Sequence, residues 1–144
     1  MVLVKHILEG KGSEVWNISP ETKIFDALKL MAEKNVGALL VMEGKEIEGI
    51  ISERDYARKV ILSGKSSKTC PVKEIMSNKV FYVNLNTSVE ECMALMSEKH
   101  IRHLPVWEEK KVVGLVSIGD VVKATIAQKD FVIEQLGNYI MGKV

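Results

Sequence analysis

Apolar residues recur with helical spacing in two stretches of the chain. In each stretch they fall at positions i, i+3, i+4 and i+7, which places them on one face of an α-helix. These residues are Ile24, Ala27, Leu28 and Met31 in the first stretch, and Val89, Cys92, Met93 and Met96 in the second. A threonine precedes each stretch, Thr22 and Thr87, and its hydroxyl is expected to cap the helix. The pattern predicts two amphipathic helices whose methionines belong to the core.

Each predicted helix is followed by two short apolar runs that predict a β-hairpin. The first hairpin spans 38–42 and 47–51, and the second spans 103–107 and 112–116. A further helix is predicted after each hairpin, at 53–62 and at 118–128. A short strand is predicted before each helix-hairpin unit, at 15–18 and at 80–83. The order β-α-β-β-α is therefore predicted twice.

Identical residues recur along the chain at a constant spacing of 65 positions, without a gap. The spacing relates the following pairs: Thr22 and Thr87, Leu30 and Leu95, Met31 and Met96, Leu39 and Leu104, Val41 and Val106, Gly49 and Gly114, Ser52 and Ser117, Asp55 and Asp120. A single register held for this length indicates two copies of one supersecondary unit. We expect an α/β (α+β) fold of two pseudo-symmetric copies packed sheet to sheet, with ligand sites in the clefts between them.

The predicted organisation has five parts. They are an N-terminal segment (1–14), the first copy (15–63), a linker (64–79), the second copy (80–128) and a C-terminal helix (129–144). Asp130 is a candidate cap for that last helix. Its apolar residues fall largely on one side, which must be covered either by folding back or by a second subunit. We expect a homodimer, because isologous helix contacts are a common way to bury such a face.

Composition narrows the class of function. The net charge is +1, from 20 Lys and Arg against 19 Asp and Glu, which gives no reason to expect a nucleic-acid or membrane surface. No apolar run approaches the ~20 residues that cross a bilayer. The two cysteines, Cys70 and Cys92, have no metal-ligand spacing, and no metal is expected. Together with the absence of a signal-peptide pattern at the N-terminus, this favours a cytoplasmic setting.

Both hairpins end in the same motif, glycine, two apolar residues, serine, any two residues and aspartate. The motif occupies 49–55 and 114–120, and the second copy also carries Ile-Arg-His-Leu-Pro-Val at 101–106. This arrangement resembles the CBS domain in its two-copy form, the Bateman module, over roughly 15–128. The run from Ser52 to Lys59 further resembles a group of stand-alone bacterial CBS-pair proteins.

The resemblance implies a regulatory module that binds AMP, ADP, ATP or NAD, with S-adenosylmethionine a weaker candidate. It assigns the ribose hydroxyls to Asp55 and Asp120 and the phosphate to the Ser52 and Ser117 turns. The other residues that it implies are the basic side chains and backbone groups near the same turns: Arg54, Arg58, Arg102, His103, Leu104 and Pro105. Gly119 stands where the first copy has Arg54, so the two sites are expected to differ.

Each of these residues also has a purely structural interpretation. The aspartates can be helix N-terminal charges, the serines helix caps, the arginines solvated side chains and His103 a structural histidine. Trp16 and Trp107 are expected to pack rather than to stack on a ligand, and Cys70 is expected to be an ordinary linker cysteine.

Three functions remain open from the sequence. The first is a nucleotide sensor that acts in trans through an unidentified effector protein, reading either energy or redox state. The second is a constitutive dimeric scaffold whose clefts are not used. The third is an enzyme, which the absence of a nucleophile–base pair, a Walker loop or a metal set argues against.

Overall fold

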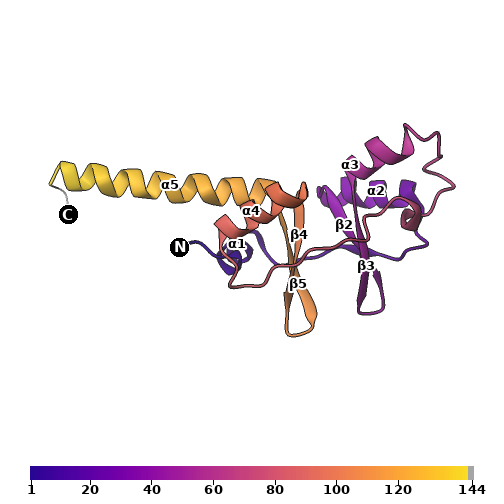
Figure 1. Cartoon of the computed structure of the whole chain (residues 1–144), viewed down its shortest axis with the longest axis horizontal. Helices are drawn as coiled ribbons and strands as arrows, with labels where there is room; N and C mark the ends of the chain where they lie inside the picture. Colours follow the sequence, from indigo (N-terminus) through magenta and orange to yellow (C-terminus); the bar gives the residue numbers. More distant parts are fainter. Residues whose placement is uncertain (143–144) are drawn as a thin grey trace. The chain divides into compact units, whose positions relative to one another are not determined.

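The computed structural model describes residues 1–142 and divides into two compact units. The first-repeat unit consists of residues 15–81, and the second-repeat unit consists of residues 1–14 and 82–144. Both units combine helices with β-structure, as Figure 1 shows, which confirms the predicted α+β class. The N-terminal segment therefore belongs with the second repeat, although it precedes the first in the chain.

The first-repeat unit holds a three-stranded sheet in the order β1-β2-β3. Strand β1 pairs with β2 in parallel, and β2 pairs with β3 in antiparallel fashion. The elements are β1 (Asn17–Ile18), α2 (Ile24–Lys34), β2 (Ala38–Glu43), β3 (Glu46–Ser52), α3 (Glu53–Asp55), the π-helical turn η1 (Tyr56–Val60) and the 3₁₀ turn η2 (Val72–Glu74). The core of this unit joins α2 to β2, β3 and the linker: Ile24, Ala27, Met31, Leu39, Val41, Ile51, Val60, Cys70, Val72 and Ile75.

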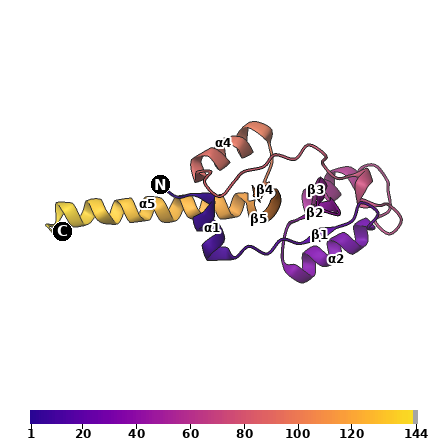
Figure 2. The same ribbon diagram turned by 90° about the horizontal axis from the view of Figure 1, so that it is seen from below.

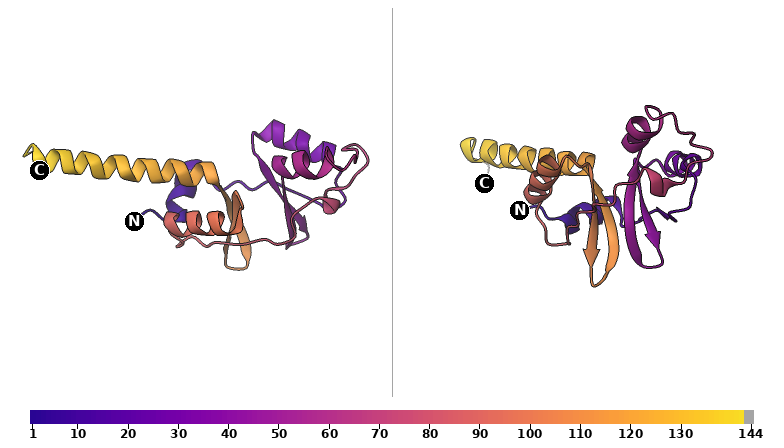
Figure 3. Two further views of the ribbon diagram at one scale, coloured as in Figure 1. Left: turned by 45° about the horizontal axis from the view of Figure 1, so that its top comes forward. Right: turned by 45° about the vertical axis from the view of Figure 1, so that its right-hand side comes forward.

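The second-repeat unit holds an antiparallel hairpin and three helices. Its elements are α1 (Val4–Lys11), α4 (Val89–Lys99), β4 (His103–Glu108), β5 (Lys111–Ser117) and α5 (Ile118–Ile140). Figures 2 and 3 show α1 and α4 beside the first half of α5, whose second half runs on past them. Of its fully buried side chains, Val4 comes from α1, Val89 from α4, and Leu104 and Val116 from the hairpin.

For one helix and two strands of each copy, the spacing of 65 positions holds to the residue. Helix α2 maps onto α4, β2 onto β4 and β3 onto β5. The residues that end the two helices, Asn35 and His100, share the left-handed conformation with φ of 54°. A register shift follows Val41 in one hairpin and Val106 in the other. The prediction of two copies of one unit is confirmed.

A segment from outside each repeat packs against the glycine of its hairpin. A Cβ atom on Gly49 would lie 2.7 Å from the carbonyl oxygen of Ser77, in the linker. A Cβ atom on Gly114 would lie 2.7 Å from a methyl carbon of Leu8, in α1. At both positions a Cβ atom would lie closer than van der Waals contact, but the obstacle is backbone at Gly49 and the end of a flexible side chain at Gly114.

Several local predictions are wrong in position. The N-caps of α2 and α4 are Lys23 and Ser88 instead of Thr22 and Thr87, and only Ser88 accepts a capping bond, from Glu91 N–H at 3.1 Å. The strand predicted at 80–83 is reduced to one bridge between Val83 and Val106. The helix predicted at 53–62 is α-helical for three residues and then widens into η1.

Two predictions about helices also need correction, one about a helix cap and one about a buried methionine. Helix α5 runs without a break from Ile118, so Asp130 lies in its interior and caps nothing. Met31 and Met96 are core residues as expected, but Met93 is 42% exposed. The buried residues of α4 are Val89, Cys92 and Met96, whereas the Met93 sulfur lies 3.2 Å from the Thr125 hydroxyl of α5.

Candidate functional site

The first Ser-x-x-Asp turn joins β3 to α3 and forms a reciprocal capping box. The Oδ2 atom of Asp55 accepts hydrogen bonds from the Ser52 backbone N–H at 2.9 Å and from the Ser52 hydroxyl at 3.1 Å. The Asp55 backbone N–H donates to the Ser52 Oγ atom at 3.2 Å. This exchange satisfies donors that a helix start otherwise leaves unpaired. Ser52 is thus the helix cap that was predicted, and Asp55 lies in the first turn of the helix, where a negative charge was expected.

The second turn, between β5 and α5, repeats this geometry. The Asp120 Oδ2 atom accepts from the Ser117 backbone N–H at 2.8 Å, and the Asp120 N–H donates to the Ser117 Oγ atom at 3.1 Å. Within residues 1–142, the Oδ1 atom of Asp120 accepts no hydrogen bond. The second turn therefore keeps one carboxylate oxygen available to a ligand.

A lysine accompanies each aspartate, and the two lysines come from different places in the chain. Lys59, one turn further along in η1, has its Nζ atom 3.2 Å from the Asp55 Oδ1 atom. The equivalent position in the second copy is Ala124. There the ammonium group comes from Lys11 at the end of α1, 2.6 Å from the Asp120 Oδ2 atom and 2.9 Å from the Leu115 carbonyl oxygen. Sequence analysis missed both lysines; the i, i+4 spacing from Asp55 was a signal for Lys59 alone.

The lysine changes the ionisation of Asp120. Burial by itself raises the pKa of this carboxyl, but the hydrogen bonds from Lys11 and from the Ser117 backbone outweigh it and hold the pKa below its ordinary value. Asp120 is therefore a carboxylate at neutral pH. An ionised carboxylate is acceptor-only and suits two neighbouring hydroxyl donors, such as those of a ribose.

Comparison with known proteins identifies the architecture. The model of the CBS domain family matches residues 12–61 and 72–127. The chain belongs to the CBS domain family. Its repeats are thus a CBS pair, as the motifs at 49–55 and 114–120 suggested.

Similar CBS proteins include stand-alone modules. A putative signal-transduction protein with CBS domains from Burkholderia ambifaria has 50% identity and a TM-score of 0.84, over 88% of this chain and 95% of that one. The mitochondrial CBS domain-containing protein CBSX3 of Arabidopsis thaliana is 43% identical over 91% of this chain, and the match spans 66% of that protein's own length.

Two further similar solved structures are a ligand complex and an oligomer. The CBS domain pair of protein MJ0100, in complex with 5′-methylthioadenosine and S-adenosyl-L-methionine, has 25% identity and a TM-score of 0.76 over 86% of this chain and 99% of that one. A hexameric CBS-CP12 protein from bloom-forming cyanobacteria has 32% identity and a TM-score of 0.75 over 85% of this chain and 71% of that one. CBS pairs thus include adenosine-ligand binders and oligomers.

The remaining predicted site residues fall into two groups. In the second CBS repeat, Arg102 and His103 lie beside the Ser117 turn, because the Arg102 carbonyl oxygen accepts from Ile118 N–H at 2.8 Å and His103 is in register with Ser117. In the first repeat, Arg54 is partly buried within the Ser52 turn, and Arg58 is exposed one turn later.

Leu104 and Pro105, whose backbone groups were predicted to lie near a bound nucleotide, belong to β4. The Leu104 side chain is fully buried in the core, and the Pro105 carbonyl oxygen accepts from Val83 N–H at 3.0 Å. These groups hold the hairpin in place. The contact of these backbone groups with a nucleotide stays a prediction.

Neither cysteine has the properties of a nucleophile. Burial raises the pKa of the Cys92 thiol to about 11. Burial and a hydrogen bond to Glu74 likewise raise the pKa of the Cys70 thiol, whose sulfur lies 2.7 Å from the carboxylate. A raised thiol pKa keeps the reactive thiolate scarce at neutral pH. Among residues 1–142 no cluster of three or more His, Cys, Asp or Glu side chains has metal-binding geometry, and no helix is long and apolar enough to cross a membrane.

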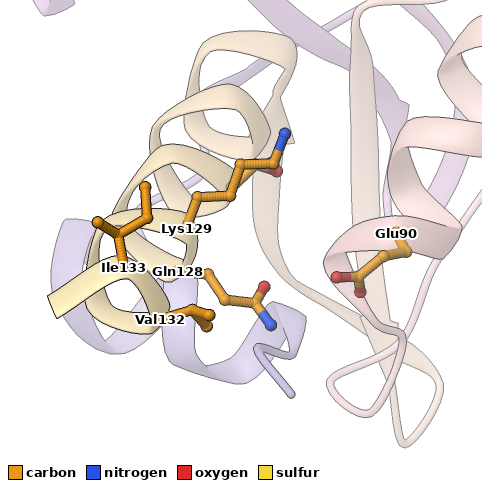
Figure 4. A pocket seen from close by; sticks show the side chains of 6 residues that line it. Glu90, Gln128, Lys129, Val132 and Ile133 are labelled. Carbon is orange, nitrogen blue, oxygen red and sulfur yellow. The ribbon is translucent and has the colours of Figure 1, made fainter. Parts of the chain in front are cut away.

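A pocket of about 380 Å³ lies apart from the Ser117 turn, further along α5. Figure 4 shows its lining side chains, which come from α5 and from the start of α4: Glu90, Thr125, Gln128, Lys129, Val132 and Ile133. None of the predicted ligand residues lines it. The pocket therefore belongs to the surface of α5 and α4 and not to the candidate nucleotide site.

Replacing Lys11 by methionine is expected to lower the stability of the protein at neutral pH by roughly 0.5–1 kcal/mol. The effect is small because the lysine side chain is 38% exposed and solvent screens its charge. The folded-state pKa of Asp120 lies below its ordinary value of 3.8, so the pair stabilises the fold above that value and loses its effect as the pH falls through the folded pKa. Urea unfolding should therefore separate wild type from Lys11→Met at pH 7, and the difference should shrink as the pH falls below 3.8. Lys5→Met, at an exposed lysine of the same helix, serves as the control; an equal loss in both variants at pH 7 would contradict the prediction.

Proposed function

We propose that this CBS pair is a regulatory module that binds an adenine nucleotide or NAD through its Ser-x-x-Asp turns. The observation that supports the proposal best is the recurrence of one carboxylate geometry in both repeats. In each repeat the aspartate is held at a helix start by two capping bonds and is accompanied by a lysine. A carboxylate held rigidly in this way is suited to two adjacent ribose hydroxyls, and the nearby ammonium group to a phosphate.

The two turns are not equivalent, and the proposal makes the second one the stronger site. Asp55 uses both carboxylate oxygens within the protein, whereas Asp120 keeps Oδ1. The serine side chain supports the carboxylate in both turns: the Ser52 hydroxyl donates to the Asp55 Oδ2 atom, and hydrogen bonding by the Ser117 side chain helps to lower the pKa of Asp120. Arg102 also lies at this second turn. A ribose hydroxyl can reach the Oδ1 atom of Asp120 without displacing a lysine, whereas the Oδ1 atom of Asp55 is paired with Lys59.

The module is proposed to work without catalysis and to pass its signal to a separate effector protein. Both thiols have raised pKa values, and the carboxylates form caps and ion pairs, so the proposal assigns no nucleophile to the chain. A homodimer remains part of the proposal, and its surface is derived below. The cytoplasmic location stays a prediction, and the Arabidopsis relative is described as mitochondrial.

A thermal-shift panel with AMP, ADP, ATP, NAD, NADH and S-adenosylmethionine tests the proposal. A ligand that binds the folded protein stabilises it by about 2.7 kcal/mol at one hundred times its dissociation constant. For a chain of this size we expect the adenine ligand that binds to raise the melting temperature by roughly 5 °C or more. No shift with any of them at millimolar concentration would contradict the proposal and favour the scaffold alternative.

A further inference from the structure

An apolar stripe follows the full length of α5. Its members are separated by alternating steps of four and three residues, the spacing of a coiled-coil seam. We name these residues the α5 seam: Val122, Ile126, Lys129, Ile133, Leu136 and Ile140. Lysine is the single polar member.

The α5 seam is exposed within the described chain. Its five apolar side chains are between 48% and 81% exposed. The seam lies next to the side of α5 that contacts the body of the unit, where Val121 is fully buried and the Thr125 hydroxyl lies 3.2 Å from the Met93 sulfur. Because α5 continues straight to Ile140, the described tail does not fold back to cover this face.

We propose that the α5 seam pairs with the α5 seam of a second copy of this chain, in antiparallel orientation. The inference rests on the proposed homodimer but does not depend on nucleotide binding. A second copy presents a stripe of identical spacing, as an isologous interface requires. With Val132 and Tyr139 beside it, the face offers seven large exposed side chains. At roughly 100 Å² each, they approach the ~800 Å² per partner of a stable interface.

The position of the lysine decides the orientation. In a parallel pair, equivalent positions face each other, so Lys129 would meet Lys129 of the partner subunit inside the seam. In an antiparallel pair, a seam residue that follows a step of four faces a seam residue that follows a step of three. Ile126 then faces Leu136 of the partner subunit, and Lys129 faces Ile133 of the partner subunit. At ~1.5 Å per residue, Asp130 of the partner subunit lies only about 4.5 Å further along the axis, within reach of the ammonium group.

The same register gives the pocket in Figure 4 an occupant. The pocket opens beside the seam, between Thr125 and Ile133. In the antiparallel register, Val132 of the partner subunit lies at the same height along the axis as residue 130. It lies on the side of the seam where Thr125 and Val132 line the pocket. An apolar side chain from the second copy therefore fills the pocket, and no small-molecule ligand is needed to explain it.

A charge in the seam tests the surface. Ile133→Glu is expected to raise the dimer dissociation constant at least 100-fold, measured by sedimentation equilibrium between 1 and 100 µM. Phe131→Glu is the matched control, because Phe131 is 62% exposed and lies about 200° around the helix from Ile133. It should change the dissociation constant less than threefold, and circular dichroism should show both variants folded.

A dimer unaffected by Ile133→Glu would overturn the proposed surface but leave the homodimer. A wild type that is monomeric at 100 µM would overturn both, whereas nucleotide binding is judged separately by the thermal-shift panel.

Engineered cysteines test the orientation. The double variant Ile126→Cys and Leu136→Cys should form a covalent dimer under mild oxidation, whereas each single variant should not. A disulfide needs Cα atoms within ~7 Å, and two positions ten residues apart in one helix are about 15 Å apart, so the bond must join two chains. The native Cys70 and Cys92 are buried and provide a low background. Covalent dimers from both single variants would show parallel pairing and overturn the antiparallel model.

Discussion

Replacing both turn aspartates, Asp55→Asn and Asp120→Asn in one chain, is expected to abolish nucleotide-induced stabilisation. A hydrogen bond to a charged acceptor contributes ~1.5–3 kcal/mol, and a ribose can donate two to one carboxylate. Replacing each carboxylate by an amide removes its charge and one hydrogen-bond acceptor. The affinity for the nucleotide should therefore fall about 100-fold or more. Isothermal titration calorimetry with the ligand found in the thermal-shift panel measures this loss directly.

Asparagine is the informative substitution because it separates binding from folding. Its amide oxygen can still accept the serine backbone N–H that now reaches the Oδ2 atom of each aspartate, so the helix caps remain. Glu53→Gln is a matched control, because it neutralises an exposed carboxylate inside the first Ser-x-x-Asp turn that makes no capping bond. Full affinity in the double asparagine variant would refute the ribose role of both aspartates.

The single variants should differ. Asp120 keeps one carboxylate oxygen without a protein partner in residues 1–142, whereas Asp55 uses one oxygen for Ser52 and the other for Lys59. The larger loss of affinity is therefore expected from Asp120→Asn. An equal loss from each single variant would indicate two equivalent sites instead of a dominant second one.

The repeated architecture could be predicted because it follows from the spacing of apolar residues along the chain. The helical spacing before each hairpin and the fixed offset between copies both reflect which side chains face a core. These features depend on neighbours within a few residues, and the structure reproduces them in α2 and α4 and in both hairpins. The Ser-x-x-Asp turns were equally visible, since a capping box is also a local motif.

The features that sequence analysis missed depend on distant contacts or on competing local signals. Lys11 lies 109 residues before Asp120, and nothing in its own segment marks it as the partner of that carboxylate. Asp130 has the residue type of a helix cap, but the helix that enters from Ile118 already supplies its backbone bonds.

Gly49→Ala is expected to destabilise the protein by about 2–3 kcal/mol, and Gly114→Ala by no more than about 1 kcal/mol. The two glycines are equivalent in the repeat, so the comparison isolates what lies against each one. A Cβ atom at Gly49 meets the Ser77 carbonyl oxygen at 2.7 Å. That backbone is held by two hydrogen bonds with Ile50, of 2.9 and 3.0 Å, and cannot withdraw without breaking them. Overpacking against a fixed group typically costs ~1–3 kcal/mol.

At Gly114 the obstacle is the end of a side chain. A Cβ atom there meets the two terminal methyl carbons of Leu8, at 2.7 and 2.8 Å, and these can rotate or shift with α1. Alanine also loses less backbone entropy on folding than glycine, which offsets part of the cost. Thermal unfolding should place Gly49→Ala roughly 5–10 °C below wild type and Gly114→Ala within about 3 °C of it. If Gly114→Ala were the less stable of the two, α1 would be held on the second repeat more rigidly than the linker is held on the first, and the Lys11–Asp120 pair would be the first contact to examine.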